Sequence, residues 1–186
     1  MPAPTRTPRD RWVAAGLDAL AEGGLESVRV EALAARLGVT KGGFYGYFPN
    51  RAALLTEMLD EWERRTTDDV IAQTEREGGE PSARMRRAGL RTFSSELLPI
   101  ELAVRSWARR DPAVAARLKR VDNVRMGYLR TLFGAYLDDP DEIEARSTLA
   151  FTLAIGHHFM AADHEGRTER EAMRLASEYI LRPPRP

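Results

Sequence analysis

The sequence predicts an all-α protein in which a small N-terminal head of three helices is followed by a larger helical bundle. Apolar residues recur at helical spacing through most of the chain, which favours helices that each bury one face. Beyond Gly78–Pro81 no segment alternates apolar and polar residues, and no Asn-Gly pair marks a hairpin turn. Glycine and proline residues divide the chain into about nine helical segments.

The first two helices of the head are bounded by proline and glycine residues. The first is expected to begin near Thr7–Pro8, because proline fits the first helical position, and to end at Gly23–Gly24. Residues 1–7 are expected to form a disordered arm. The second helix runs roughly over residues 30–37, and Gly38 forms the turn after it because glycine readily adopts left-handed geometry.

A third, short helix is predicted to begin after Thr40, a good N-cap residue, and to be stopped by Pro49. Phe44 and Phe48 stand four residues apart, so they share one helical face and are expected to enter the core. The outward side then carries Lys41, Gly42, Tyr45 and Gly46. Each glycine inside a helix costs about 1 kcal/mol relative to alanine. A helix that keeps several glycines despite this cost is therefore not selected for its own stability. The missing side chains would instead allow a large binding partner to come close to its backbone.

The rest of the chain continues with helical periodicity. A long fourth helix is expected from a cap at Asn50 to about Glu75, and Gly78–Pro81 is the clearest break after it. Later helices are predicted at roughly 82–95, 97–109, 112–137, 141–162 and 168–181, followed by a frayed tail from Arg182 to Pro186.

Composition excludes several classes of protein. The formal net charge is zero, so DNA contacts must come from the placement of individual charges rather than from bulk charge. Without cysteine there is no disulfide framework and no cysteine-based zinc site. The N-terminus lacks the apolar core of a signal peptide, and the most apolar run, Leu149–Ala162, is too short to span a bilayer. We therefore expect a cytoplasmic protein that makes no membrane contact.

Patterns that indicate a metal site or an enzyme are missing. His157 and His164 are seven residues apart, too far for the paired i, i+4 geometry of a helical metal site, so interface or core histidines are the preferred interpretation. The acidic residues 138–142 suit the start of a helix rather than acid–base catalysis. No Gly-rich phosphate loop, nucleophile elbow or Ser/His/Asp arrangement is visible. We expect no enzymatic activity, no metal and no cofactor.

The stretch Gly38–Val39–Thr40–Lys41–Gly42, with Tyr45 and the run Phe48–Pro49–Asn50–Arg51 after it, resembles the helix-turn-helix of TetR-type transcriptional repressors. The resemblance covers roughly residues 9–56, and it implies that the helix opening at Thr40 is the recognition helix. The segment Glu101–Pro112 also resembles the body of one TetR subgroup. The implied organisation is a DNA-binding domain over residues 1–51 and an effector-binding and dimerisation domain over residues 52–186.

The resemblance assigns candidate DNA contacts, which are Arg29, Thr40, Lys41, Gly42, Gly43, Tyr45, Tyr47 and Arg51. Tyr47 and Arg51 match family positions that usually touch phosphates. Lys41 suits a phosphate or a guanine edge, and Tyr45 suits a phosphate or a thymine methyl group, unless it packs against the second helix. Thr40 offers a hydroxyl or the N–H groups of the helix start.

The sequence gives less support for a DNA contact at three positions. Arg29, at the start of the second helix, is as readily explained as an unpaired surface arginine. Gly43 and Gly46 depart from the family, which more often has a small hydroxyl residue and a large polar residue there. Their loss removes contacts to bases and favours reading of DNA shape.

In a TetR-like body, several aromatic and polar residues would surround an effector cavity: Trp62, Phe93, Trp107, Met126, Tyr128, Phe133 and His157. A bundle interior with aromatic walls and few polar groups suits a small apolar or aromatic ligand. The alternative is that these side chains simply fill the core, as aromatic residues at helical spacing usually do.

The last two predicted helices correspond to the dimer-forming pair of the family. Candidate interface residues on them are Leu149, Leu153, Gly156, Leu175 and Tyr179. One three-helix head holds too little DNA for tight specific binding, so a homodimer on a palindromic double-stranded operator is expected, with its heads about 34–36 Å apart. The same apolar residues could also form a core within one chain.

The function expected from the sequence is therefore a ligand-responsive transcriptional regulator, in which effector binding changes the spacing of the heads and releases the operator. The alternative is a ligand-binding or interaction module of the same fold whose glycine-rich head no longer reads DNA.

Overall fold

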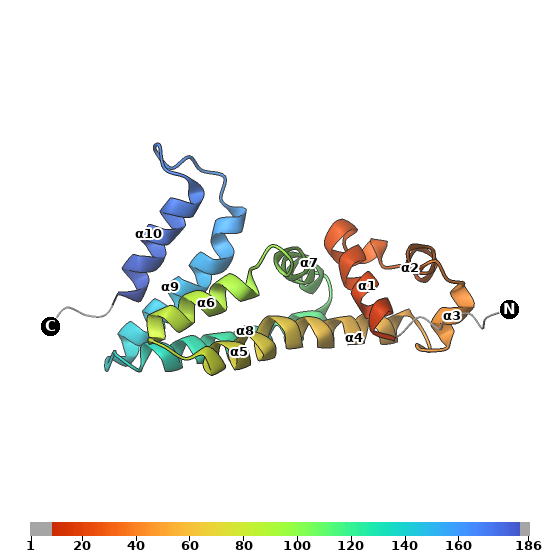
Figure 1. Cartoon of the computed structure of the whole chain (residues 1–186), viewed down its shortest axis with the longest axis horizontal. Coiled ribbons are helices and arrows are strands. Elements are labelled where there is room, and N and C mark those ends of the chain that lie inside the picture. Colours follow the sequence, from red (N-terminus) through yellow and green to blue (C-terminus); the bar gives the residue numbers. More distant parts are fainter. Residues whose placement is uncertain (1–8, 183–186) are drawn as a thin grey trace. The chain divides into compact units, whose positions relative to one another are not determined.

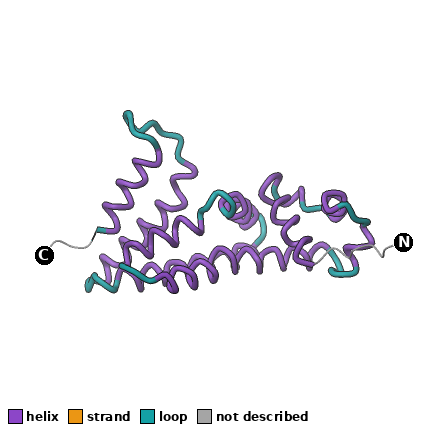
Figure 2. The backbone as a smooth tube through the Cα atoms, viewed as in Figure 1, coloured by secondary structure: helices purple, strands orange, loops and turns teal. Residues whose placement is uncertain are grey.

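The computed structural model describes residues 9–182, which form helices and connecting loops (Figures 1 and 2). No strand is present in this part of the chain, where the only β-type pairing is an isolated bridge between His164 and Arg167. The all-α prediction is confirmed. The predicted N-terminal arm, residues 1–7, and residues 183–186 of the predicted tail lie outside the described residues.

The described chain divides into two compact units. The first unit comprises residues 9–68 and 95–119, and the second comprises residues 69–94 and 120–182. The first unit therefore contains the predicted head together with segments that follow it by more than forty residues in the sequence. The functional boundary at residue 51 stays a prediction.

The first unit contains α1 (Arg9–Gly23), a 3-10 turn (Leu25–Ser27), α2 (Val30–Leu37), α3 (Lys41–Tyr45), α4 (Arg51–Glu63), a π-helical turn (Arg64–Asp68), α7 (Leu98–Ala108) and the start of α8 (Pro112–Phe133). Helix α1 is its centre, because α1 contacts α2, α4 and α7. At its crossing with α4, a Cβ atom on Gly16 would lie 2.6 Å from Met58 Sδ. Any side chain at position 16 would therefore force the Met58 side chain to move.

The second unit contains α5 (Asp69–Glu77), α6 (Pro81–Thr92), the end of α8, α9 (Pro140–Gly156), a 3-10 turn (His157–Phe159) and α10 (Glu169–Leu181). Helices α5 and α6 pack together, as do α9 and α10 (Figure 1). Its buried core cluster consists of Met85, Leu132, Phe133, Leu137 and Leu181. The phenol of Tyr136 also donates to the carbonyl of Leu181 at 3.2 Å, which ties the end of α10 to this core.

Several predicted boundaries are confirmed. Helix α2 covers Val30–Leu37, and Gly38 after it has left-handed geometry with φ of 67°. Asn50 Oδ1 accepts a hydrogen bond from the backbone N–H of Ala53 at 2.9 Å, which caps α4 as predicted. Gly78 and Gly79, with φ of 62° and 93°, separate the end of α5 from the start of α6 at Pro81.

Several predicted helices differ from the structure. The helices predicted over residues 112–137 and 141–162 end earlier, at Phe133 and Gly156. The predicted fourth helix is divided into α4 and α5 by the π-helical turn, within which the buried Thr66 hydroxyl donates to the carbonyl of Trp62 at 2.7 Å. A threonine side chain that binds the preceding turn in this way perturbs an α-helix. Helix α3 ends at Tyr45, four residues before the predicted stop at Pro49, and the Thr40 side chain makes no capping hydrogen bond.

Candidate nucleic-acid interface

The α2–α3 turn has the geometry of a helix-turn-helix connection. The N–H of Gly38 donates to the carbonyl of Ala35 at 3.1 Å, and the N–H of Val39 donates to the carbonyl of Ala34 at 3.0 Å. These bonds satisfy the carbonyl groups at the end of α2, and they require a left-handed residue at position 38. The chain therefore turns sharply and begins α3 three residues after Gly38.

Buried aromatic residues hold α3 in place. The Phe44 and Phe48 rings stack with centroids 5.2 Å apart, and Trp12 of α1 meets Phe44 edge-on at 5.3 Å. All three side chains are fully buried. A helix of five residues with glycine at two of them has little stability of its own, so this packing keeps it folded.

The other face of α3 is exposed to solvent. Thr40, Lys41, Gly42 and Gly43 are all exposed, and Tyr45 is 53% exposed although its ring meets Phe44 edge-on. No atom lies within 4 Å of a Cβ placed on Gly43, and one on Gly42 meets only Thr40 Oγ1, at 3.8 Å. Packing within the unit therefore does not require either glycine.

Lys41, at the first position of α3, forms an ion pair with Glu31 of α2. This hydrogen-bonded pairing raises the pKa of the Lys41 ammonium group and lowers the pKa of the Glu31 carboxyl group. Both side chains are more than half exposed, so the pair contributes little to stability and can exchange for another anion.

Arg51 and Tyr47 lie at the edge of this surface. Arg51 donates from Nη2 to the carbonyl of Leu25 at 2.8 Å and from Nε to the carbonyl of Val28. It therefore fastens the start of α4 to the turn before α2, a structural role that its position in sequence did not reveal. Tyr47 is half-buried, and its backbone N–H donates to the carbonyl of Phe44 at 2.9 Å.

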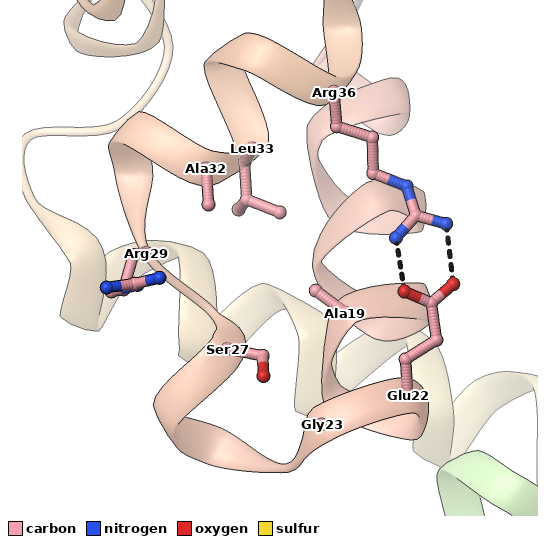
Figure 3. Close-up of a pocket in the computed structure, with 8 residues that line it drawn as sticks. All are labelled: Ala19, Glu22, Gly23, Ser27, Arg29, Ala32, Leu33 and Arg36. Carbon is pink, nitrogen blue, oxygen red and sulfur yellow. Dashed lines mark hydrogen bonds and ion pairs between the residues drawn. The ribbon is translucent and has the colours of Figure 1, made fainter.

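Arg29 borders a shallow groove between α1 and α2, with a volume of about 450 Å³ (Figure 3). On one side of the groove, Arg36 pairs with Glu22 through two hydrogen bonds of 2.8 Å. Arg29 occupies the N-cap position of α2, where its side chain makes no capping hydrogen bond, and it is exposed.

The predicted effector residues are divided between the two units. Trp62 and Trp107 lie in the first unit and are buried, whereas the other five lie in the second. Trp62 donates from Nε1 to Oε2 of the fully buried Glu101 at 2.9 Å, and Arg105 donates to Oε1 of the same carboxylate at 2.9 Å. A buried ionic cluster was not among the sequence predictions.

In the second unit, Phe133 belongs to the hydrophobic core, which favours the interpretation that this ring fills the core rather than lining an effector cavity. The phenol of Tyr128 donates to the carboxylate of Glu75, which Arg84 also binds. Burial, and next the hydrogen bond to Glu75, raise the pKa of Tyr128 to about 12. Met126 and Phe93 are half-buried.

The histidines of the second unit lie after the end of α9. The His157 and His158 rings lie 3.6 Å apart, and His157 Nδ1 is 2.9 Å from the carbonyl of Leu153. Burial, and next the neighbouring His157, lower the pKa of His158. Within residues 9–182, no group of three or more histidine, aspartate or glutamate side chains is placed to hold a metal ion.

The predicted dimer residues lie on α9 and α10, and several are exposed. Leu149, Leu175 and Tyr179 are 55%, 44% and 77% exposed, and Gly156 is exposed as well, whereas Leu153 is half-buried. Phe159, just after α9, adds another exposed aromatic ring. Large apolar side chains are thus exposed on two helices that pack together, and exposed apolar surface of this kind is typical of sites that another protein covers.

No helix in the described part of the chain is both long enough and apolar enough to cross a membrane.

Comparisons with known proteins agree with this geometry. Residues 13–58 match the family model described as bacterial regulatory proteins, tetR family. No curated protein is significantly similar to the chain in sequence.

Solved structures share the fold along almost the whole chain. A transcriptional regulator from Rhodococcus sp. Rha1 is 21% identical with a TM-score of 0.71, and the match covers 94% of each chain. A regulator of the TetR/AcrR family from Thermobifida fusca is 18% identical with a TM-score of 0.65, covering 96% of this chain and 98% of the other. AibR, solved with isovaleryl coenzyme A and operator DNA, is 14% identical with a TM-score of 0.66, covering 93% and 99%.

Proposed function

We propose that this chain, whose N-terminal domain belongs to the tetR family of bacterial regulatory proteins, represses transcription by binding a palindromic operator as a homodimer and leaves the operator when a small-molecule effector binds. The observation that carries this proposal is the exposed face of α3. Its glycines are not required by packing, and each lowers helix stability, so their use is explained by the close approach of DNA.

The proposed contacts follow from this face. Lys41 exchanges Glu31 for a phosphate or a guanine edge, and Thr40 and Tyr45 contact the DNA beside it. The absence of side chains at Gly42 and Gly43 lets the backbone of α3 approach the groove. We assign phosphate contacts to Tyr47, Arg29 and Arg51, which complete the proposed contact surface.

Selection of genomic DNA fragments by the purified protein at physiological salt, followed by sequencing, tests the proposal. Enrichment of one palindromic site is expected. A folded protein that enriches no sequence, with or without cell extract as a source of effectors, would favour the alternative of a ligand-binding module that no longer reads DNA. DNA binding that does not weaken with salt would also favour this alternative. Contacts to phosphates release counterions, so binding through them must weaken as the salt concentration rises.

Substitution of the contact residues gives a sharper prediction. We expect Lys41→Ala and Tyr47→Phe each to weaken operator binding about tenfold or more. Each removes a hydrogen bond to a charged phosphate, and such bonds contribute more to the free energy of binding than bonds between neutral groups. Because the homodimer carries two copies of Lys41, Lys41→Ala is also expected to reduce the salt slope of binding by about 1.8, whereas Tyr47→Phe leaves the slope unchanged. Fluorescence anisotropy over a range of salt concentrations measures both quantities.

The matched control is Lys119→Ala, since Lys119 is an exposed lysine on α8 rather than on α2 or α3. Unchanged operator affinity in both Lys41→Ala and Tyr47→Phe, with the fold retained, would refute the assignment of these contacts.

The proposed dimer buries the exposed apolar side chains of α9 and α10. Leu149→Arg is expected to convert the dimer to a monomer, because an arginine in the centre of a symmetric helical interface would meet its own copy. Sedimentation velocity gives the mass of the particle. Leu90→Arg replaces a leucine that is 70% exposed on α6, and this control should remain dimeric. Dissociation by both variants, or by neither, would place the interface elsewhere.

The effector that we favour is a small apolar or aromatic molecule bound in the helical body. An acyl coenzyme A is the second candidate, because AibR was solved with isovaleryl coenzyme A. Either ligand releases DNA only if it binds the non-binding conformation more tightly, and typical couplings of this kind are about 1–3 kcal/mol. Titration of the protein–operator complex with each ligand class distinguishes the two candidates.

A further inference from the structure

Arg9, the first residue of α1, contacts two segments that lie far from it in the sequence. Its Nε donates to Oε2 of Glu57 on α4 at 2.8 Å, and its Nη2 binds the other oxygen of the same carboxylate. Its Nη1 donates to the backbone carbonyl of Tyr47 at 2.6 Å. The guanidinium carbon also lies 4.5 Å from the centre of the Phe48 ring.

These contacts fix the turn that joins α3 to α4. The Phe48 ring is fully buried and stacks on Phe44, so the inner side of this turn is anchored by packing. Arg9 adds a restraint from outside, since it lies over Phe48 and binds the carbonyl of the residue before it. A fork that uses both oxygens of Glu57 defines the position of the guanidinium more closely than a single bond would.

From this arrangement we infer that Arg9 and Glu57 are positioning residues for DNA binding, an inference that rests on the proposed function. The pair holds the turn after the recognition helix, and thereby the Tyr47 side chain, in the place from which it reaches a phosphate. We assign Arg9 no DNA contact, because its guanidinium also binds the Tyr47 carbonyl and lies over the Phe48 ring, and so has more partners to give up than Lys41 has.

The charge of Glu57 makes the inference testable by the sign of an effect. A carboxylate beside the DNA-binding surface repels the phosphate backbone, so simple electrostatics predicts that removing it strengthens binding. If Arg9 were a phosphate contact restrained by Glu57, removal of Glu57 would free it and strengthen binding as well. The positioning role predicts weaker binding instead.

The experiment compares Glu57→Gln and Arg9→Lys with the natural protein on the selected operator. Each variant is expected to weaken binding about tenfold, the effect of losing one charge-assisted hydrogen bond. Glutamine cannot accept two hydrogen bonds from the guanidinium as a carboxylate does, and lysine lacks the two-pronged guanidinium. The matched controls are Glu26→Gln and Arg11→Lys, which make the same exchanges at exposed positions of the same unit. Glu26→Gln is expected to strengthen binding slightly, and Arg11→Lys to leave it unchanged.

A double-mutant cycle links the pair to Tyr47. In a protein that already carries Tyr47→Phe, the phosphate hydrogen bond is missing, so Glu57→Gln should cost less than about threefold. Thermal unfolding is followed in parallel, with all binding measured well below the melting temperature. An exposed ion pair adds little to stability, so the melting temperature should change little while the affinity falls.

Three results would overturn the inference. The first is that Glu57→Gln binds operator as well as or better than the natural protein, and the second is that its cost is undiminished beside Tyr47→Phe. The third is a lowered melting temperature with unchanged affinity, which would make the pair structural only. Failure of the proposed function is a different observation, because the natural protein itself would then select no operator.

Discussion

Replacing Phe44 by alanine is expected to lower the free energy of unfolding of the first unit by about 3–5 kcal/mol, the usual cost of truncating a buried phenylalanine. The ring is fully buried between Trp12 and Phe48, so its removal leaves a cavity in the core of the first unit. The five residues of α3 cannot stay helical without this anchor. Operator binding should therefore be lost together with stability.

Tryptophan fluorescence during urea denaturation measures this effect in the correct unit. The chain has three tryptophans, Trp12, Trp62 and Trp107, and all of them lie in the first unit. The control is Tyr45→Ala, which removes the adjacent exposed ring and should cost about 1 kcal/mol or less. If the two variants proved equally stable, Phe44 would not be the anchor of α3.

Replacing Arg105 by methionine is expected to cost about 3–5 kcal/mol, because it leaves the carboxylate of Glu101 buried without its counter-charge. Glu101 is 0% exposed, and Arg105 Nη2 lies 2.8 Å from its Oε1. The hydrogen bond from Trp62 Nε1 remains in the variant, but a neutral donor does not replace the positive charge of Arg105. The same tryptophan fluorescence measurement applies, since all three residues belong to the first unit.

Two comparisons separate the loss of a counter-charge from a loss of packing. Combining Arg105→Met with Glu101→Leu removes both charges, so the double variant should recover much of the lost stability. Arg64→Met breaks an exposed pair with Glu61 and should cost less than about 1 kcal/mol. An Arg105→Met variant that is as stable as Arg64→Met would show that the Glu101 carboxylate does not depend on Arg105.

Interactions between near neighbours in the sequence were predictable. The bounds of α2, the left-handed turn at Gly38 and the Asn50 cap each depend on residues no more than five positions apart. The glycine-rich α3 was also located from sequence, although its end at Tyr45 was not. Proline at position 49 disfavours helical geometry only at Phe48. In the structure the helix has already given way to a turn, in which the N–H groups of Tyr47 and Phe48 both donate to the carbonyl of Phe44.

The sequence by itself determined the helical class, the position of the short glycine-rich helix and the residues on its exposed face, because periodicity, caps and glycines act over a few residues. Only the tertiary structure decided that Arg51 fastens the head, that Arg9 binds Glu57 and that Trp62 binds Glu101. These partners are separated by 26, 48 and 39 positions in the sequence. Contacts at such separations form only when whole helices pack, and no local pattern of residues specifies which side chains then meet.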